Sequence, residues 1–171
     1  MLKRSGFKKK LSKPMKRTPL RKVSLTQKTK TTKPSVPTTK SLSKKVWELC
    51  RQITFKRYGN TCYTTGSTNL SGINLQCGHG KPKGALPMKF KYDLRNLRPQ
   101  SYNANMNLGG MSDIFIAKLE REKEGLQFLK EACVKIDGRW EVKRDQTMGT
   151  MEAKIFLEGL IDKYTEMLSN M

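Results

Sequence analysis

Acidic residues are missing from the first quarter of the chain. The 171 residues include 35 Lys or Arg and 14 Asp or Glu, which gives a net charge of +21. Residues 1–45 contain sixteen of these basic residues and no acidic one, so the remaining residues carry a net charge of only +5. This asymmetry predicts a cationic arm over residues 1–42, followed by one globular domain over residues 43–171.

Long apolar segments are also missing. No stretch approaches the roughly 20 consecutive apolar residues that a membrane-spanning helix needs. The basic N-terminus has neither the apolar stretch nor the small-residue cleavage site of a signal peptide. We therefore expect no membrane contact and a cytoplasmic location.

Cysteine is scarce, and its spacing excludes two common roles. The four cysteines include no Cys-x-x-Cys pair, the spacing of a zinc knuckle, and they match no disulfide framework. We expect reduced thiols in the cysteines of this chain, which are Cys50, Cys62, Cys77 and Cys133.

The predicted arm has few apolar residues, and its four prolines interrupt any helix. High charge without apolar residues predicts disorder in the free protein. Clustered cations that neutralise phosphates release condensed counterions, so the arm is typical of a nucleic-acid-binding segment, although a solubility tail has the same composition. The basic residues expected to contact DNA are Lys8, Lys9, Lys10, Lys16, Arg17, Arg21 and Lys22.

The predicted helices and strands indicate an α+β domain. Apolar spacing predicts helices over residues 43–58 and 150–168, and a helix from Ser112 that continues to Ile136 with an interruption near Gly125. Residues 137–142 suggest a turn followed by a short strand. The segment 60–111 is rich in Gly, Asn, Thr and Pro, and its apolar piece INLQC (73–77) predicts a hairpin among ordered loops. The chemistry should lie in this segment, because long loops that are not simple connectors tend to carry function.

Three polar residues stand out in the segment 60–111. His79, the single histidine, lies in Cys77-Gly78-His79-Gly80, Asn96 lies in YDLRNLRPQ (92–100), and Asn105 closes SYNAN (101–105). A lone histidine is usually structural, and asparagines in loops usually form turns. The order of the three residues in the chain, with a predicted helix after them, favours a shared functional role.

This order resembles the HNH endonucleases, in an His-Asn-Asn form, and more closely the phage recombination endonuclease family NinG, also called Rap. The basic leader RSGFKKKLSKPMKRTPLRK, the motif QCGHG and the stretch YDLRNLRPQSYNANMNLGG carry the resemblance over residues 1–125. It implies a ββα-metal (His-Me finger) centre flanked by helices. It also implies a metal-dependent endonuclease that hydrolyses phosphodiester bonds in branched recombination or replication intermediates of a phage, acting in the host cytoplasm.

One departure concerns zinc. The family commonly has two Cys-x-x-Cys knuckles, which here fall on Cys62-Tyr63-Thr64-Thr65 and Ser101-Tyr102-Asn103-Ala104, so that Cys62 is the only retained knuckle cysteine. A structural zinc site normally needs four strong ligands. We expect no structural zinc, and packing or hydrogen bonds in its place.

The resemblance assigns roles to individual residues. A neutral His79 would take the proton of the attacking water, and Asn96 would hold the His79 segment through its amide. The metal, Mg²⁺ or Mn²⁺, would be held by Asn105, with His79 or Asp93 as further candidates, since Gly78 replaces the carboxylate or histidine that many HNH enzymes place there. Phosphate contacts are expected from Arg95, Arg98, Lys81, Lys83, Lys89 and Lys91.

Two other functions remain open at this point. One is a catalytically inactive HNH-like protein that still binds DNA, and the other is a basic structural component bound to nucleic acid. A protein partner at the C-terminal helices is a further expectation. A homodimer would suit the symmetric cutting of a junction.

Overall fold

A computed structural model describes residues 36–144 and 147–171. Every arm residue expected to contact DNA, from Lys8 to Lys22, lies outside these residues. The first helix, α1 (Thr39–Tyr58), begins four residues before its predicted start. The Thr38 hydroxyl accepts a hydrogen bond from the Ser41 amide at 3.2 Å, and the Ser41 hydroxyl accepts one from the Thr38 amide at 3.0 Å. This reciprocal cap satisfies amide groups that the first helical turn leaves free, and it places the helix start at Thr39.

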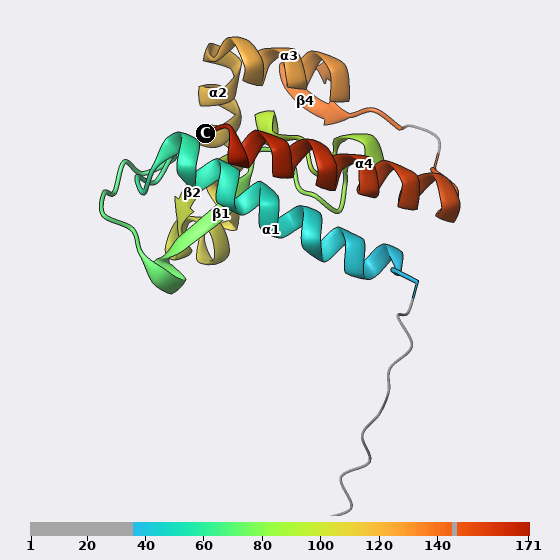
Figure 1. Cartoon of the computed structure of the whole chain (residues 1–171). Helices are drawn as coiled ribbons and strands as arrows, with labels where there is room; N and C mark the ends of the chain where they lie inside the picture. Colours follow the sequence, from blue (N-terminus) through green and yellow to red (C-terminus); the bar gives the residue numbers. More distant parts are fainter. Residues whose placement is uncertain (1–35, 145–146) are drawn as a thin grey trace, which may run out of the picture. The chain divides into compact units, whose positions relative to one another are not determined.

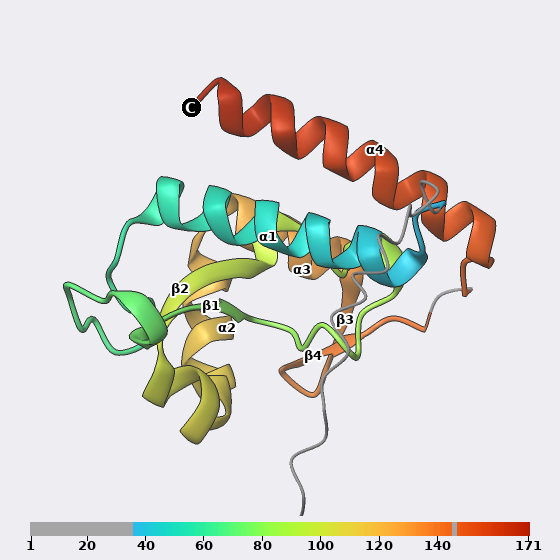
Figure 2. The same ribbon diagram turned by 60° about the horizontal axis from the view of Figure 1, so that its bottom comes forward.

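The helix α1 packs beside the last helix, α4 (Thr150–Ser169), as Figures 1 and 2 show. Leu42, Val46, Cys50 and Ile53 recur at helical spacing on the buried face of α1. They form the largest hydrophobic cluster together with residues of α4, of β1 and β2 and of the segment that joins these strands, namely Cys77, Tyr92, Leu94, Leu97, Leu157, Ile161 and Tyr164. The α4 bounds agree with the predicted helix over residues 150–168.

A two-stranded antiparallel hairpin lies in the middle of the unit. Strands β1 (Leu75–His79) and β2 (Leu97–Ser101) pair with His79 opposite Leu97 and Leu75 opposite Ser101. The connection between the strands, residues 80–96, contains two short 3₁₀ turns, η2 (Met88–Phe90) and η3 (Leu94–Asn96). The hairpin predicted from INLQC is therefore present, with a long connection at the His79 end.

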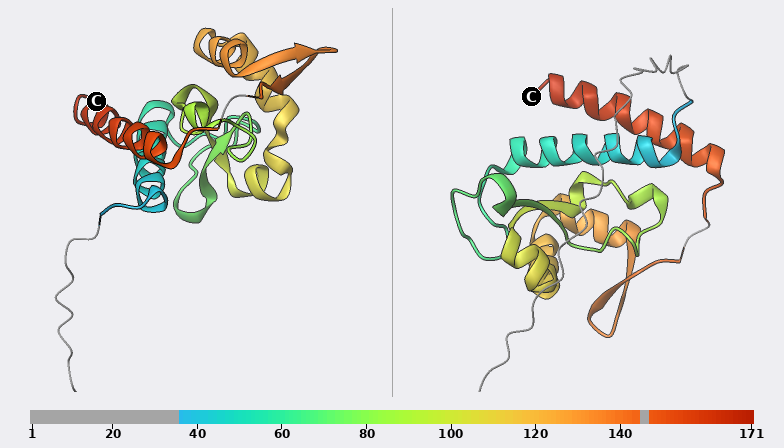
Figure 3. Two further views of the ribbon diagram at one scale, coloured as in Figure 1. Left: turned by 90° about the vertical axis from the view of Figure 1, so that its right-hand side faces the viewer. Right: turned by 90° about the horizontal axis from the view of Figure 1, so that it is seen from below.

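Helices cover both faces of the hairpin (Figure 3). Cys77 and Leu97 face α1 and α4, whereas Gly80 approaches α2 (Ser112–Arg121). A Cβ at Gly80 would lie 2.5 Å from Leu119 and 3.1 Å from Phe115, so only glycine permits this close contact. Phe115 and Leu119 belong to a second cluster, with the side chains of Leu86, Phe90, Phe128, Leu129, Ala132 and Cys133.

The predicted helix from Ser112 to Ile136 is wrong only over residues 133–136, and its interruption lies at Glu122 rather than near Gly125. The chain forms α2, then α3 (Lys123–Ala132), and then a strand β3 (Cys133–Ile136) that pairs with β4 (Arg139–Val142). The helices separate at Glu122, which has extended backbone angles of φ −95° and ψ 130°. Gly125 lies inside α3, where a Cβ would be 2.6 Å from the Leu119 carbonyl oxygen. Gly125 therefore serves the close packing of α3 on α2 rather than the break.

The architecture is α+β, as predicted: helices around one hairpin, plus a second small hairpin. Among the residues that the structure describes, no helix combines the length and the apolar character that a membrane crossing requires.

Candidate functional site

His79 lies at the end of β1 and faces α1. Its ring stacks on Trp47, with centroids 4.9 Å apart and planes 11° from parallel. Its Nε2 atom is buried and has no hydrogen-bond partner in the described part of the chain. Burial lowers the pKa of His79 to about 4, helped by the positive charge of Lys83. The imidazole is therefore neutral at physiological pH and has an unused polar nitrogen.

The Lys83 side chain lies close to this site. Its ammonium lies 5.0 Å from the ring centre of Trp47 and 4.3 Å from that of Tyr92. Cation–π attraction holds the ammonium between these two rings. Sequence reasoning assigned Lys83 to DNA contact but missed Trp47, because only the fold brings residues 47 and 79 together.

Asn96 fixes the backbone that follows His79. Its side chain is 1% exposed. Its Oδ1 accepts a hydrogen bond from the Lys81 amide at 2.8 Å, and its Nδ2 donates one to the Lys81 carbonyl at 2.9 Å. The Asn96 carbonyl also accepts from the Gly80 amide at 3.0 Å. These contacts join the two ends of the long hairpin connection, which is the placement that the sequence analysis expected of the Asn96 amide.

Gly78 makes room for a buried glutamine that the sequence analysis did not identify. A Cβ at Gly78 would lie 1.9 Å from Gln100 Oε1. Gln100 is fully buried, and its Nε2 donates to Thr64 Oγ1 at 3.1 Å and to the Gly110 carbonyl at 2.8 Å. Its Oε1 has no hydrogen-bond partner among residues 36–144 and 147–171. The amide oxygen of Gln100 thus occupies the space that a side chain at position 78 would fill.

The carboxylate of Asp93 is engaged elsewhere. It accepts from the Arg95 amide at 2.9 Å, which caps η3, and it pairs with the Arg95 guanidinium at 2.7 Å. Arg95 also pairs with Glu131 at 2.7 Å, and hydrogen bonds to Asp93 and Glu131 raise the pKa of Arg95. The Asp93 carboxylate and the Arg95 guanidinium are therefore paired with each other. In this arrangement Asp93 does not present a free carboxylate to a metal ion, and Arg95 does not present a free guanidinium to a phosphate.

The structure places Arg98 in the interior rather than on a surface that could contact DNA. Its side chain is only 1% exposed and forms an ion pair with Glu122. It also donates to the Leu97 carbonyl at 2.6 Å and lies 4.3 Å from the ring centre of Tyr58. A guanidinium held in this way cannot reach a DNA phosphate. Its role is structural, because it ties β2 to the α2–α3 junction.

The structure does not bring His79 and Asn105 together. Asn105 belongs to the π-helical turn η4 (Asn103–Asn107), which follows Ser101. Since Ser101 pairs with Leu75, η4 starts at the end of the hairpin opposite to His79, roughly 13 Å along the strand. The Asn105 amide contacts only Met106 Sδ, at 3.8 Å, in the part of the chain that the structure describes.

The remaining lysines of the hairpin connection have different surroundings. Lys81 donates through its ammonium to the Trp140 carbonyl, and Lys91 is half-buried. Lys89 is exposed, with its ammonium 5.3 Å from the ring centre of Phe90. Of the expected phosphate contacts, Lys89 is thus the most accessible.

The four positions at which the resembled family has zinc ligands are neighbours here. The Cys62 thiol lies 3.5 Å from Thr64 Oγ1, hydrogen-bonds to Thr65 and to the Ser101 backbone, and packs with Ala104. Burial alone would raise the pKa of Cys62, but these hydrogen bonds outweigh it and lower the pKa to about 6. Hydrogen bonds and packing thus join the two turns. No group of three His, Cys, Asp or Glu suited to a metal ion occurs in the described residues.

Comparisons with known proteins identify no relative: no family model, no curated protein and no solved structure matches the chain.

Proposed function

We propose that the protein is a metal-dependent DNA endonuclease of the HNH type that acts on branched recombination or replication intermediates of a phage. The observation that carries this proposal is the Asn96 clamp beside His79. A buried asparagine binds both backbone groups of Lys81, two residues after a neutral histidine whose Nε2 is unpartnered. A purely structural histidine would be expected to use that nitrogen in a hydrogen bond.

The charge distribution supports DNA as the substrate. Thirteen Lys or Arg and no acidic residue precede residue 36, so sequence-independent affinity for phosphates would come mainly from the arm. The folded unit would add Lys83 and Lys89 near the hairpin connection. Affinity and cutting are thus divided between the two parts of the chain.

The hairpin offers few oxygen ligands for a metal ion. A cation bound there would therefore keep most of its water ligands. Gln100 Oε1 is an unpartnered amide oxygen, but it lies over Gly78 on the face of the hairpin opposite to His79. Asn105, the ligand that the resemblance implies, belongs to η4 at the far end of the hairpin, so a cation that acts with His79 would be held mainly by water and the DNA phosphate. The Asp93 carboxylate is bound to Arg95. Mg²⁺ prefers oxygen donors, retains several waters and needs few protein ligands. When bound beside a DNA phosphate, such an ion would stabilise the charge of the leaving 3′ oxygen.

His79 would act as the general base. Its neutral Nε2 takes a proton from water, the water oxygen forms a bond to phosphorus, and the bond from phosphorus to the 3′ oxygen breaks. The leaving oxygen takes its proton from solvent. Nε2 is buried, so the side chains around it must move before a water molecule can reach it. The nearby Lys83 ammonium, whose charge acts on His79, would find an alternative partner in a DNA phosphate.

The direct test is incubation of the purified full chain with labelled duplex, flap and four-way junction DNA, with Mg²⁺ or Mn²⁺ and with a chelator. The proposal expects cleavage that needs the metal and is fastest on the branched substrates. Binding of DNA without cleavage in either metal would contradict it.

A second function is favoured by one specific observation. The Nε2 atom of His79 is buried beneath the Trp47 stack, and the Asp93 carboxylate is bound to Arg95. A non-catalytic DNA-binding finger could keep this arrangement unchanged. It would bind all three substrates in the same assay and cut none of them.

A further inference from the structure

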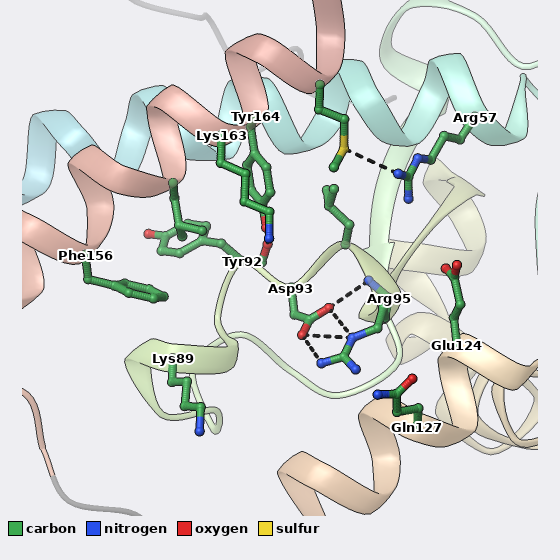
Figure 4. A pocket seen from close by; sticks show the side chains of 13 residues that line it. Arg57, Lys89, Tyr92, Asp93, Arg95, Glu124, Gln127, Phe156, Lys163 and Tyr164 are labelled. Atoms are coloured by element: carbon green, nitrogen blue, oxygen red, sulfur yellow. Dashed lines mark hydrogen bonds and ion pairs between the residues drawn. The ribbon is translucent and has the colours of Figure 1, made fainter. Parts of the chain in front are cut away.

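A cavity of about 470 Å³ borders the His79 site through Tyr92. It is lined by the end of α1, by residues 89–95 of the hairpin connection, by α3 and by α4 (Figure 4). Its lining includes none of His79, Trp47 and Lys83. The volume falls within the range of about 300–1,000 Å³ that small-molecule sites occupy.

Positive charge dominates the cavity wall. Four cationic side chains line it, and only two carboxylates do, those of Asp93 and Glu124. Of the cations, Arg95 is neutralised by Asp93 and Glu131. The other three, Arg57, Lys89 and Lys163, form no ion pair in the described part of the chain.

Two of these three cations contact uncharged groups instead. Arg57 donates to Met167 Sδ at 3.3 Å, and the Lys89 ammonium lies 5.3 Å from the Phe90 ring centre. Like charges that converge on a partly enclosed space repel each other, and an anion placed between them would relieve this repulsion. The electrostatics therefore favour an anionic ligand.

The wall also has an aromatic and a hydrogen-bonding part. The half-buried Phe156 ring extends from α4, and in Figure 4 the Lys163 side chain lies above and to the right of it and the Lys89 side chain below and to the right. Gln127 and Glu124 reach the cavity from α3 and offer amide and carboxylate groups. An anion without a planar apolar part would leave this side of the cavity unused.

We propose that this cavity binds a nucleotide, with the phosphate between Lys163 and Lys89 and the base against Phe156. A phosphate takes charge-assisted hydrogen bonds from the ammonium groups, and a base stacks on an aromatic ring. The nucleotide is either free in solution or the 5′-terminal nucleotide of a DNA strand. The proposal does not need nuclease activity, since neither His79 nor Asn96 lines the cavity; Tyr92, whose ring contacts the Lys83 ammonium, is shared with the His79 site.

The test is calorimetric titration of the full chain with deoxyadenosine 5′-monophosphate, with inorganic phosphate and deoxyadenosine as separate probes. Wild type is expected to bind the monophosphate more tightly than either part alone. Lys163→Gln removes a charged donor, and Phe156→Leu removes the aromatic face, so each should weaken binding about tenfold. Lys154→Gln is the matched control, because Lys154 lies on α4 outside the cavity, and it should change binding less than twofold.

Two results would overturn the proposal. One is equal loss of affinity in Lys163→Gln and Lys154→Gln, which would mean non-specific charge attraction. The other is binding of inorganic phosphate as tight as that of the monophosphate, which would remove the base from recognition. The source of the nucleotide follows from competition with oligonucleotides that have or lack a 5′ phosphate. Stronger competition by the phosphorylated strand assigns the site to DNA ends, and equal competition assigns it to free nucleotides.

Discussion

Asn96 binds both the amide and the carbonyl of Lys81 through its side chain, and so closes the long hairpin connection next to His79. Both backbone groups would otherwise be unpaired in a partly buried position. The stability of this connection therefore depends on a single side chain.

Asn96→Ala should destabilise the fold by about 2–3 kcal/mol, because it leaves two backbone groups without partners and removes a buried side chain. Denaturant unfolding monitored by tryptophan fluorescence measures this loss. Asn107→Ala, in an exposed contact with Asn103, is the control and should cost about 0.5 kcal/mol or less. Equal effects of the two substitutions would contradict the role assigned to the Asn96 clamp.

The pKa of His79 makes stability depend on pH in a defined direction. Because the folded-state pKa is about 4 and the ordinary value 6.5, the unfolded chain binds a proton between these pH values and the folded chain does not. Stability is therefore lost as pH falls from about 6.5 to about 4, by an amount on the order of 3 kcal/mol.

The variant His79→Gln isolates this effect, since all other titrating groups stay the same. Wild type should lose more stability than the variant over that pH interval, and both should show the same trend above pH 7. In a Lys83→Met background the pKa of His79 should rise, because one of the two causes of its depression is gone. Parallel pH curves for wild type and His79→Gln would show that His79 titrates as an exposed histidine does.

Gly78→Ala should be strongly destabilising, since the new Cβ would lie 1.9 Å from Gln100 Oε1. Displacing Gln100 breaks its hydrogen bonds to Thr64 and Gly110, at a cost of about 1–3 kcal/mol. In the double variant with Gln100→Ala the clash is absent, so the two effects should not add. Additive losses measured by denaturant unfolding would place Gln100 away from Gly78.

Arg98→Met should lower stability by about 2–3 kcal/mol, because it breaks a buried ion pair with the partly exposed Glu122. The DNA affinity of the folded variant should equal that of wild type. By comparison, Lys89→Gln removes an exposed charge, so it should leave stability unchanged and weaken DNA binding. A large loss of DNA affinity in folded Arg98→Met would contradict the purely structural role and would indicate that Arg98 contacts a phosphate.

Local signals in the sequence predict much of the fold. The helix over residues 150–168 follows from apolar spacing, and the hairpin follows from INLQC and the asparagine-rich turns around it. The strand β3 was missed because Cys133 and Ile136 continue the helical spacing of the preceding residues. Pairing with β4 decides between helix and strand at this point, and pairing is not a local property.

The site was predicted less completely, for a physical reason. The positions of His79 and Asn96 follow from their order in the chain, but the neighbour of His79 is Trp47, 32 residues earlier. Arg98 was assigned to phosphate contact because a guanidinium can bind a phosphate through two hydrogen bonds, and its actual partner Glu122 comes from a helix junction distant in the sequence. Long-range contacts of this kind leave no periodic signal in the sequence.

The most direct measurement is the single-turnover rate of junction cleavage in Mg²⁺ by wild type and by His79→Gln, at protein concentrations that saturate the DNA. Cleavage by wild type and a rate at least about 100-fold lower in the variant, with equal DNA affinity, is the result predicted for a general base. Equal rates in the two proteins, or no cleavage by either, would contradict a catalytic role for His79.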